Sequence, residues 1–425
     1  SHANASDWVE RELTLACDKK APIISLRIED APPSKGLEVL LKLVQWLDAL
    51  TPPLETHLAL LADAVRKLLD EGPPPPPAPS PPAPPPTPPP SDVKLTNAAV
   101  LREGRLAFEQ GELSRVPDQS VRNRLLAARG AVEEVAAIFD ASWEHGRHTL
   151  AEEEVRAITV PPNDRLTTVL ALRILNVIVK HLNDASEPCR IESDEGGLIQ
   201  KEGDHVQRKG GRQEEVRDAA HTWVIDPIDG SRHLMRHLPV FTTTIALVNE
   251  HYETILAMIY APITGELFFA VRGCGAFLND WDTPLQVSGR EPGKAYVYAE
   301  FPNVDTRKGS QPEFNERCKS LKRIFRTFNR VRGFGLGSMG MAYVAKGAFD
   351  AYITLSGKTR KCDVLAGALL VNEAGGRAEI VAAHAPAQDR PESLTDVYAV
   401  GGNAKTYARL MADKRIAGLF NANLK

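Results

Sequence analysis

The sequence of 425 residues predicts an α/β protein in two parts that a proline-rich segment separates. Three observations support this prediction. Apolar residues at helical spacing alternate along the chain with short runs of β-branched and aromatic residues, a pattern typical of α/β folds. Between residues 73 and 90, 14 of 18 residues are proline and none is charged. Hydrophobic residues make up 43% of the chain, which is enough for large cores.

Composition excludes several other classes of protein. The net charge is −4, with −4 on residues 1–71 and 0 on residues 92–425, so neither part has the basic field that attracts nucleic acid or an anionic membrane. No apolar run approaches the ~20 residues that span a bilayer, and the first residues lack a signal-peptide pattern. The five scattered cysteines form no CxxC or Cys/His cluster, which argues against disulfides or structural zinc and favours the cytoplasm.

The first part, residues 1–71, alternates helical and β-rich patterns, which predicts a parallel α/β sheet. We expect helices at 8–16, 37–43 and 54–69, and strands at 21–28 and 44–50. The linker, residues 72–91, is expected to form a polyproline II spacer of roughly 55 Å at ~3.1 Å per residue. A ligand for SH3-like domains is the alternative for this linker.

Residues 6–13, 22–34 and 45–69 resemble the C-terminal half of a bacterial TIR domain. In catalytic TIR domains, a Glu in a W-x-x-x-E stretch cleaves the nicotinamide–ribose bond of NAD, and the resemblance gives that position to Glu12. The first strands of that family and its nucleotide-side loop have no counterpart here. We therefore expect Glu12 to be a solvated helix residue in a remnant or docking module.

The second part, residues 92–425, begins with helical patterns and continues with strand patterns. A helical region is expected at 94–157, with its clearest helix at 121–139, and another helix at 167–182. Strands are expected at 221–225, 241–249, 255–261 and 267–272. The polar, glycine-interrupted segment 199–217 predicts a mobile loop.

The central motif of the second part is the acidic turn of residues 226–231. An apolar strand delivers Asp226 at its C-terminal end, and Asp229 follows three residues later, so both carboxylates can face one point. Gly230 permits a tight turn, and Ser231 opens the next segment, where free backbone N–H groups would face an anion. Converging hard oxygen ligands suit Mg²⁺ and a phosphate group. A turn with two solvated Asp residues is the structural alternative.

Three further acidic positions strengthen the functional interpretation. Asp194 and Glu195 precede a Gly-Gly loop, Asp164 follows a Pro-Pro pair, and Asp363 opens an apolar helix. Asp164 and Asp363 would also be explained as helix N-terminal acids with a structural role. Four acidic positions, each beside a turn, indicate that these residues belong to one functional site and did not arise by chance.

With these residues in place, residues from about 118 to 415 resemble the inositol monophosphatase superfamily of Mg²⁺-dependent, lithium-sensitive phosphatases. The motifs that carry the resemblance lie at residues 193–196, 223–231, 273–279, 337–338 and 362–376. The resemblance implies a layered α-β-α-β-α sandwich. It also implies two-metal hydrolysis of a phosphomonoester, in which the metals lower the pKa of the attacking water and neutralise the leaving oxygen.

The resemblance further implies a role for each matching residue. The implied metal ligands are Asp194, Glu195, Asp226, the Ile228 carbonyl, Asp229 and Asp363, with Asp226 bridging two ions. Ser231, which stands where Thr is usual, would orient the water together with Asp164. The backbone N–H groups of Gly230 and Ser231 would hold phosphate, and Arg232 at the same edge is a further phosphate ligand candidate.

Departures from the family pattern bear on the substrate. Asp194 is one methylene shorter than the usual Glu, and Cys362 replaces a Trp. Ser356 stands about where inositol-cleaving members keep a Glu for ring hydroxyls. The basic turn that follows resembles 3′(2′),5′-bisphosphate nucleotidases, and a second substrate phosphate would suit Lys358 or Arg360. A solvated basic turn is the alternative.

The leading hypothesis is therefore a Mg²⁺-dependent phosphatase of a small phosphorylated metabolite. A non-catalytic signalling or scaffold protein that uses a phosphatase-like fold is the alternative, and NAD hydrolysis by the first part is a third. The expected partner is the phosphorylated substrate, with no nucleic acid and no membrane. The sequence leaves open whether the chain forms a homodimer.

Overall fold

The computed structural model divides the chain into two compact units, residues 1–92 and 93–425. It describes the backbone of residues 24–27 and 45–48 and the residues 96–110, 112–144, 147–148, 152–160, 165–183, 189–195, 197–202, 205–209, 221–302, 311–383 and 391–421. In the first unit, β1 (Ile24–Arg27) and β2 (Gln45–Asp48) pair in parallel. Both lie within the strands predicted at 21–28 and 44–50, for which a parallel sheet was expected. The predicted helices of this unit, Glu12 and the linker lie outside the described residues.

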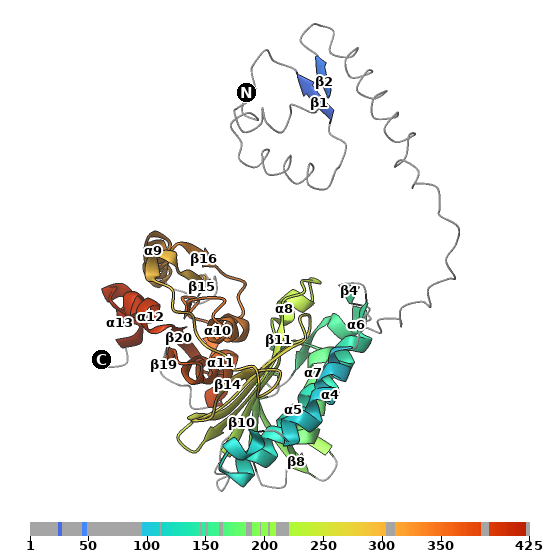
Figure 1. The fold of residues 1–425 in the computed structure, drawn as a ribbon. Coiled ribbons are helices and arrows are strands. Elements are labelled where there is room, and N and C mark those ends of the chain that lie inside the picture. Colours follow the sequence, from blue (N-terminus) through green and yellow to red (C-terminus); the bar gives the residue numbers. More distant parts are fainter. Residues whose placement is uncertain are drawn as a thin grey trace. The chain divides into compact units, whose positions relative to one another are not determined.

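Three long helices open the second unit (Figure 1). They are α4 (Asn97–Gln110), α5 (Gln119–Ala141) and α7 (Val169–Asn183). Helix α5 begins after Asp118 because the Asp118 carboxylate accepts hydrogen bonds from the N–H groups of Ser120 and Val121, at 2.7 and 3.2 Å. The helices predicted at 121–139 and 167–182 are thus confirmed. No helix among the described residues is long and apolar enough to cross a membrane.

The stretch between α5 and α7 is less helical than predicted. The expectation of a helical region through residue 157 is wrong there, because Ser142 ends α5 and short strand pairs follow. The elements of this stretch are β3 (Trp143–Glu144), β4 (Arg147–His148), α6 (Glu152–Val155), β5 (Ala157–Val160) and β6 (Arg165–Thr168). The short helix η2 (Glu112–Arg115) lies before α5. Antiparallel pairing of β5 with β6 turns the chain back immediately before α7.

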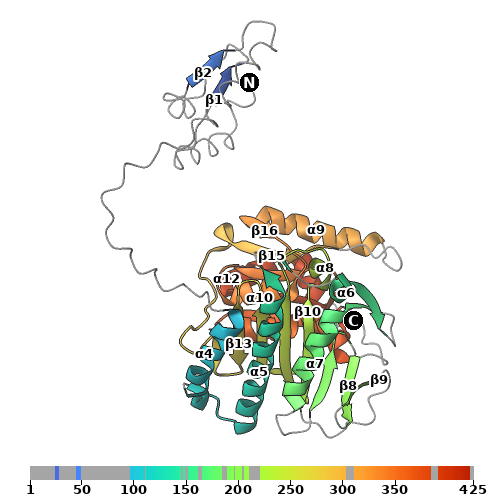
Figure 2. The same cartoon turned by 90° about the vertical axis from the view of Figure 1, so that its right-hand side faces the viewer.

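An eight-stranded mixed sheet packs against these helices (Figure 2). Its spatial order is β14-β13-β12-β11-β10-β7-β8-β9, and its one parallel pairing joins β7 to β10. The strands are β7 (Arg190–Ser193), β8 (Gly197–Glu202), β9 (His205–Lys209), β10 (His221–Asp229), β11 (Thr242–Asn249), β12 (Thr254–Ala261), β13 (Glu266–Val271) and β14 (Gly275–Leu278). The four strands predicted from residue 221 onward are confirmed.

The prediction of a loop at 199–217 is wrong for its first half. Residues of β8 and β9 pair in antiparallel register with Glu202 opposite His205, and two residues, Gly-Asp, separate the two strands in the sequence. A Gly-Asp pair between two strands is a known signal for such a hairpin. Polar residues on both strands conceal the usual alternation, and β9 forms the edge of the sheet.

A second mixed sheet, of six strands, follows in the chain. Its order is β16-β15-β17-β20-β18, with β19 paired to β20. The strands are β15 (Tyr296–Glu300), β16 (Arg330–Arg332), β17 (Ala351–Thr354), β18 (Thr359–Arg360), β19 (Arg377–Ala382) and β20 (Asp396–Gly402). The accompanying helices are α8 (Ser231–Leu234), η4 (Pro292–Lys294), α9 (Gln311–Thr327), α10 (Gly337–Ala345), α11 (Lys361–Glu373), η5 (Glu392–Leu394), α12 (Ala404–Met411) and α13 (Lys414–Asn421).

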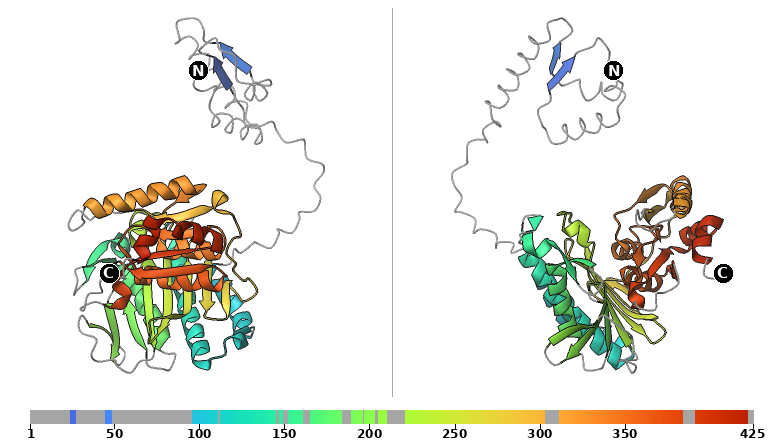
Figure 3. Two further views of the ribbon diagram at one scale, coloured as in Figure 1. Left: turned by 90° about the vertical axis from the view of Figure 1, so that its left-hand side faces the viewer. Right: turned by 180° about the vertical axis from the view of Figure 1, so that it is seen from behind.

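Three hydrophobic cores separate the layers of the second unit. The first lies between α4, α5, α7 and one face of the large sheet, and it takes Trp223 and Ile225 from β10. The second lies between the other face, which presents Val224, and helices α10 and α11. The third lies between the smaller sheet and α9, α12 and α13. Alternation of inward side chains along β10 therefore builds two cores at once, and the layers run helix, sheet, helix, sheet, helix (Figure 3, right).

The packing of α10 on the smaller sheet depends on a helical glycine. A Cβ atom at Gly340 would lie 2.7 Å from a ring carbon of Tyr352 and 2.8 Å from one of Tyr298. Both rings are fully buried, and both hydroxyls are hydrogen-bonded, at 2.5 Å from Tyr352 to Glu300 and at 3.1 Å to Tyr298 from the Leu336 N–H. Neither ring can therefore move freely.

Gly340→Ala is expected to lower the free energy of unfolding by about 1–3 kcal/mol, because overpacking a rigid core forces side chains from their preferred rotamers. The matched control is Gly418→Ala in α13, where a Cβ would meet nothing within 4 Å. That change should be neutral or stabilise by up to about 1 kcal/mol through helix propensity. Denaturant unfolding of the two variants measures both values. Equal effects would show that the tyrosine pair does not restrict α10.

Candidate active site

The acidic turn forms where β10 loses its regular pairing with β11. The register shifts between Asp226, which lies opposite Thr244, and Asp229, which lies opposite Thr242. The Asp226 Oδ1 accepts a hydrogen bond of 3.0 Å from the Ile228 N–H, which folds the strand into a local turn. The bulge thus brings two carboxylates three residues apart toward one point, as the sequence predicts.

Gly230 ends this turn in a conformation that favours glycine. Its φ is +95°, and a Cβ atom there would lie 2.6 Å from the Leu336 side chain and 3.1 Å from the Val240 carbonyl oxygen. Ser231 follows as the first residue of the short helix α8. Gly230 therefore allows the chain to leave the strand and to present Ser231 directly after the two acids.

The third carboxylate comes from helix α11, which packs between the two sheets. Asp363 lies in the first turn of α11, where its Oδ2 accepts a hydrogen bond of 2.9 Å from the Arg360 N–H. An acid at this position is stabilised by the helix dipole and by the free N–H groups of the first turn. Ligand atoms of Asp226, Asp229 and Asp363 all lie within 4.8 Å of one another.

Burial and mutual repulsion dominate the electrostatics of this cluster. Burial raises the pKa of Asp226 well above its usual range, and the negative charges of Asp194, Asp229, Asp363 and Glu195 raise it further. Burial also raises the pKa of Asp229, as does the charge of Asp363, whereas hydrogen bonds from Ser338 oppose that rise. The cluster therefore concentrates negative charge that the fold alone does not compensate.

Asp194 and Glu195 lie beside the cluster, at the end of β7. Both side chains are buried, and the Asp194 N–H donates a hydrogen bond of 3.1 Å to the Ile225 carbonyl of the adjacent β10. The Asp194 carboxylate forms an ion pair with Arg360 and accepts from the Cys362 thiol at 3.7 Å. Arg360, predicted as a ligand for a second phosphate, thus contacts an acid of the site.

Two polar residues to which sequence analysis assigned no role act on the acids, Ser338 through hydrogen bonds and Glu300 through its charge. Ser338 donates hydrogen bonds to the Asp229 Oδ2 through its N–H, at 3.2 Å, and through its hydroxyl. Glu300 is buried, which raises its pKa, and accepts from Thr359 at 2.6 Å and from Tyr352 at 2.5 Å. The motif at residues 337–338 was a sequence signal for Ser338, whereas Glu300 had none.

The residues predicted to contact the substrate lie outside the acidic cluster. Arg232 and Lys358 are exposed. Ser356 accepts hydrogen bonds of 3.1 Å from the N–H groups of Lys358 and Thr359, so its hydroxyl closes the turn between β17 and β18. Asp164, the predicted partner of Ser231, lies outside the described residues.

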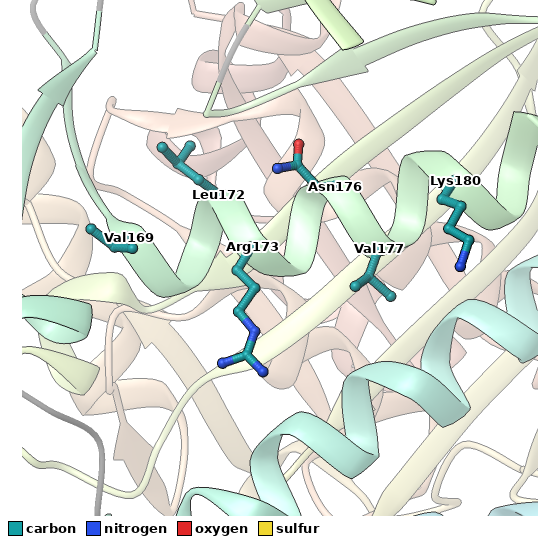
Figure 4. Close-up of a pocket in the computed structure, with 6 residues that line it drawn as sticks. All are labelled: Val169, Leu172, Arg173, Asn176, Val177 and Lys180. Atoms are coloured by element: carbon teal, nitrogen blue, oxygen red, sulfur yellow. The ribbon is translucent and has the colours of Figure 1, made fainter. Parts of the chain in front are cut away.

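A surface pocket of about 440 Å³ lies on α7 and contains no residue of the cluster. Figure 4 shows its lining residues on successive turns of that helix, and they are Val169, Leu172, Arg173, Asn176, Val177 and Lys180. None of these is acidic, so the pocket does not share the chemistry of the acidic cluster.

The donor set of the cluster fits a hard divalent cation. Three carboxylates offer oxygen ligands within one small volume, with Asp194 and Glu195 beside them. Oxygen-only ligands suit Mg²⁺, and a dication would relieve the repulsion that raises the pKa of Asp226. The residues present therefore match the cation that the sequence predicts.

Asp226→Asn is expected to raise the melting temperature of the protein in EDTA at neutral pH. A carboxyl whose pKa is higher in the fold than in the unfolded chain destabilises the fold above its ordinary pKa, and this penalty vanishes as the pH falls below about 4. The Asn side-chain oxygen can still accept from the Ile228 N–H. The gain should therefore be present at pH 7 and shrink toward pH 4.

Thermal unfolding across this pH range measures the effect. Asp282→Asn, in an exposed turn, is the matched control and should leave the melting temperature unchanged. A lower melting temperature of Asp226→Asn in EDTA at pH 7 would contradict the interpretation that repulsion destabilises the metal-free cluster.

Comparison with known proteins agrees with this geometry. The chain is 33% identical over 163 residues to an inositol-1-monophosphatase of Caulobacter vibrioides, covering 38% of this chain and 61% of that protein. It is 33% identical over 232 residues to the Nus factor SuhB of Xylella fastidiosa, covering 54% of this chain and 74% of that protein. The chain thus spans only about three fifths of the first relative.

Solved structures and the family model extend the comparison. The crystal structure of the extragenic suppressor protein SuhB from Bartonella henselae matches with a TM-score of 0.51 at 21% identity, over 71% of this chain and 98% of that one. The model of the inositol monophosphatase family matches residues 120–416. This match does not reach the N-terminal segment, whose likeness to a TIR domain stays a sequence-based prediction. From residue 120 to residue 416, the chain belongs to the inositol monophosphatase family.

Proposed function

We propose that the chain hydrolyses the phosphomonoester of a small phosphorylated metabolite and that residues 92–425 carry this activity. The observation that supports the proposal most strongly is the convergence of Asp226, Asp229 and Asp363 within 4.8 Å. These acids would hold Mg²⁺ together with Asp194, Glu195 and the Ile228 carbonyl. When bound, Mg²⁺ supplies an electrophile that acidifies water and balances the charge of phosphate.

The protein's own groups then have three tasks in this proposal. Ser231 and Asp164 would orient the attacking water. The N–H groups of Gly230 and Ser231 bind phosphate oxygens, with Arg232 at the same edge. Ser338 holds Asp229 through two hydrogen bonds, which fixes the carboxylate in its productive orientation.

The turn between β17 and β18 supports a substrate other than a plain inositol phosphate. In the resemblance, inositol-cleaving members keep a carboxylate near Ser356 for ring hydroxyls, whereas the Ser356 hydroxyl here accepts from the N–H groups of its own turn. Lys358 on the same turn is exposed and positively charged. We therefore propose a substrate with two phosphates, such as 3′-phosphoadenosine 5′-phosphate, as the preferred class.

A binding protein without turnover is the alternative, and relatives named as Nus factors make it relevant. The cost of the cluster argues against it. Burying Asp226 and Asp229 beside the half-buried Asp363 destabilises the metal-free fold, and a protein that only binds a partner gains nothing from that cost. The acidic set therefore favours catalysis.

Asp229→Asn is expected to abolish phosphate release while the protein stays folded. The Asn oxygen can accept both hydrogen bonds from Ser338, but the site loses one of its negative charges. Phosphate release in Mg²⁺ and in EDTA, with circular dichroism as the folding check, measures the outcome. The exposed Asp282→Asn should retain full activity. Activity that survives EDTA, or a folded and fully active Asp229→Asn, would refute the proposed chemistry.

Lys358→Ala tests the substrate class. If Lys358 binds the second phosphate, kcat/KM should fall about tenfold to a hundredfold for 3′-phosphoadenosine 5′-phosphate and stay unchanged for inositol 1-phosphate. Steady-state kinetics on both substrates give the comparison. A wild type that strongly prefers inositol 1-phosphate, with no effect of the substitution on either substrate, would support inositol monophosphatase activity instead.

A further inference from the structure

Arg360, at the end of β18, contacts Asp194, at the end of β7, and the proposed chemistry does not use this contact. Its guanidinium donates from Nη1 to the Asp194 Oδ1, although the two residues are 166 positions apart in the chain. The side chain of Asp194 is 11% exposed and that of Arg360 is 33% exposed. The ion pair is therefore partly shielded from water, with the carboxylate on the buried side.

The backbone holds both partners of this pair in place. Arg360 ends β18, where it lies opposite Asp396 of β20, and its N–H donates to the Asp363 Oδ2 at 2.9 Å. Asp194 is anchored to β10 by its N–H bond to the Ile225 carbonyl. The same turn that presents Asp363 to the cluster thus directs a guanidinium to Asp194.

This contact places a monovalent cation on a carboxylate that also faces the cluster. Asp194 acts electrostatically on Asp226, and its Oδ1 already accepts from both Arg360 and the Cys362 thiol. A divalent ion that binds the Asp194 Oδ1 must share this oxygen or displace the guanidinium, and an ion on the other oxygen still shares the charge of the carboxylate with Arg360. A hydrogen bond between a charged guanidinium and a carboxylate is stronger than one between neutral groups, which makes Arg360 an effective competitor.

We propose that Arg360 is a built-in counter-ion of Asp194 that competes with a divalent cation for this carboxylate and so weakens the cation site to which Asp194 contributes. The inference rests on the proposed function in taking the acidic cluster as a cation site. It assigns Arg360 a role in setting cation affinity, which differs from the phosphate contact expected from the sequence. Arg360 is a positioning residue here, because it acts through Asp194.

Titration of the full chain with Mn²⁺, followed by calorimetry and by the electron paramagnetic resonance of free Mn²⁺, tests the inference without any turnover. Arg360→Gln keeps a polar side chain but removes the charge, and it should tighten the weakest Mn²⁺ site about tenfold. Lys358→Gln removes the same charge from the same turn and should change that affinity less than about twofold. In an Asp194→Asn background, Arg360→Gln should have no effect.

Arg360→Ala provides a second route to the same answer. It should tighten Mn²⁺ binding likewise, and added guanidinium ion should restore the weaker binding, whereas NaCl at equal ionic strength should not.

Equal effects of Arg360→Gln and Lys358→Gln, or an Arg360 effect that persists without the Asp194 carboxylate, would overturn the inference while leaving the phosphatase proposal intact. The expected Mn²⁺ affinities without phosphate release would refute only the phosphatase. No Mn²⁺ binding by any variant would overturn both.

Discussion

Repulsion among two buried carboxylates and a half-buried third is the constraint on which the rest of the site depends. Asp226, Asp229 and Asp363 lie within 4.8 Å of one another, and burial and mutual charge raise the pKa of the two that belong to β10. Such an arrangement persists only where the surrounding fold is stable enough to enforce it. Here the enforcing structure is a strand buried on both faces and a helix packed between two sheets. The hydrophobic cores thus supply the free energy that the acidic cluster costs.

The acids come from two elements that pack against each other, the large sheet and helix α11. The geometry of the site therefore depends on how these two elements pack. Asp226 and Asp229 belong to the large sheet, whereas Asp363 belongs to α11, which packs on the opposite side of the second core. Ser338 on α10 reaches across the same boundary to Asp229. Any shift of α10 and α11 relative to β10 would therefore change the distances between the carboxylates. This is why close packing at Gly340 and at the Gly230 turn matters to chemistry as well as to stability.

The sequence reveals those parts of the site whose signals are local. Asp226, Asp229 and Gly230 occupy one turn, and Asp363 opens one helix, so strand and helix patterns suffice to identify them. Ser338 meets Asp229 from 109 residues away and Arg360 meets Asp194 from 166 residues away, and no periodicity encodes such contacts. Glu300 likewise ends an ordinary apolar strand. The same limit explains the missed β8–β9 hairpin, since two short strands rich in polar residues carry little hydrophobic alternation.

Arg360 acts on two acids of the site, through its backbone on one and through its side chain on the other. Its backbone N–H stabilises Asp363, and its guanidinium neutralises part of the charge of Asp194, so one residue supports one acid and competes for another. The first effect needs only a backbone and would survive any side chain, whereas the second needs the guanidinium. Cation affinity can therefore vary through the side chain at this position while the helix start and the Asp363 geometry stay fixed. Because rigid backbone elements hold the acids, a substitution of this one side chain on the second sheet can change the cation affinity without moving the acids.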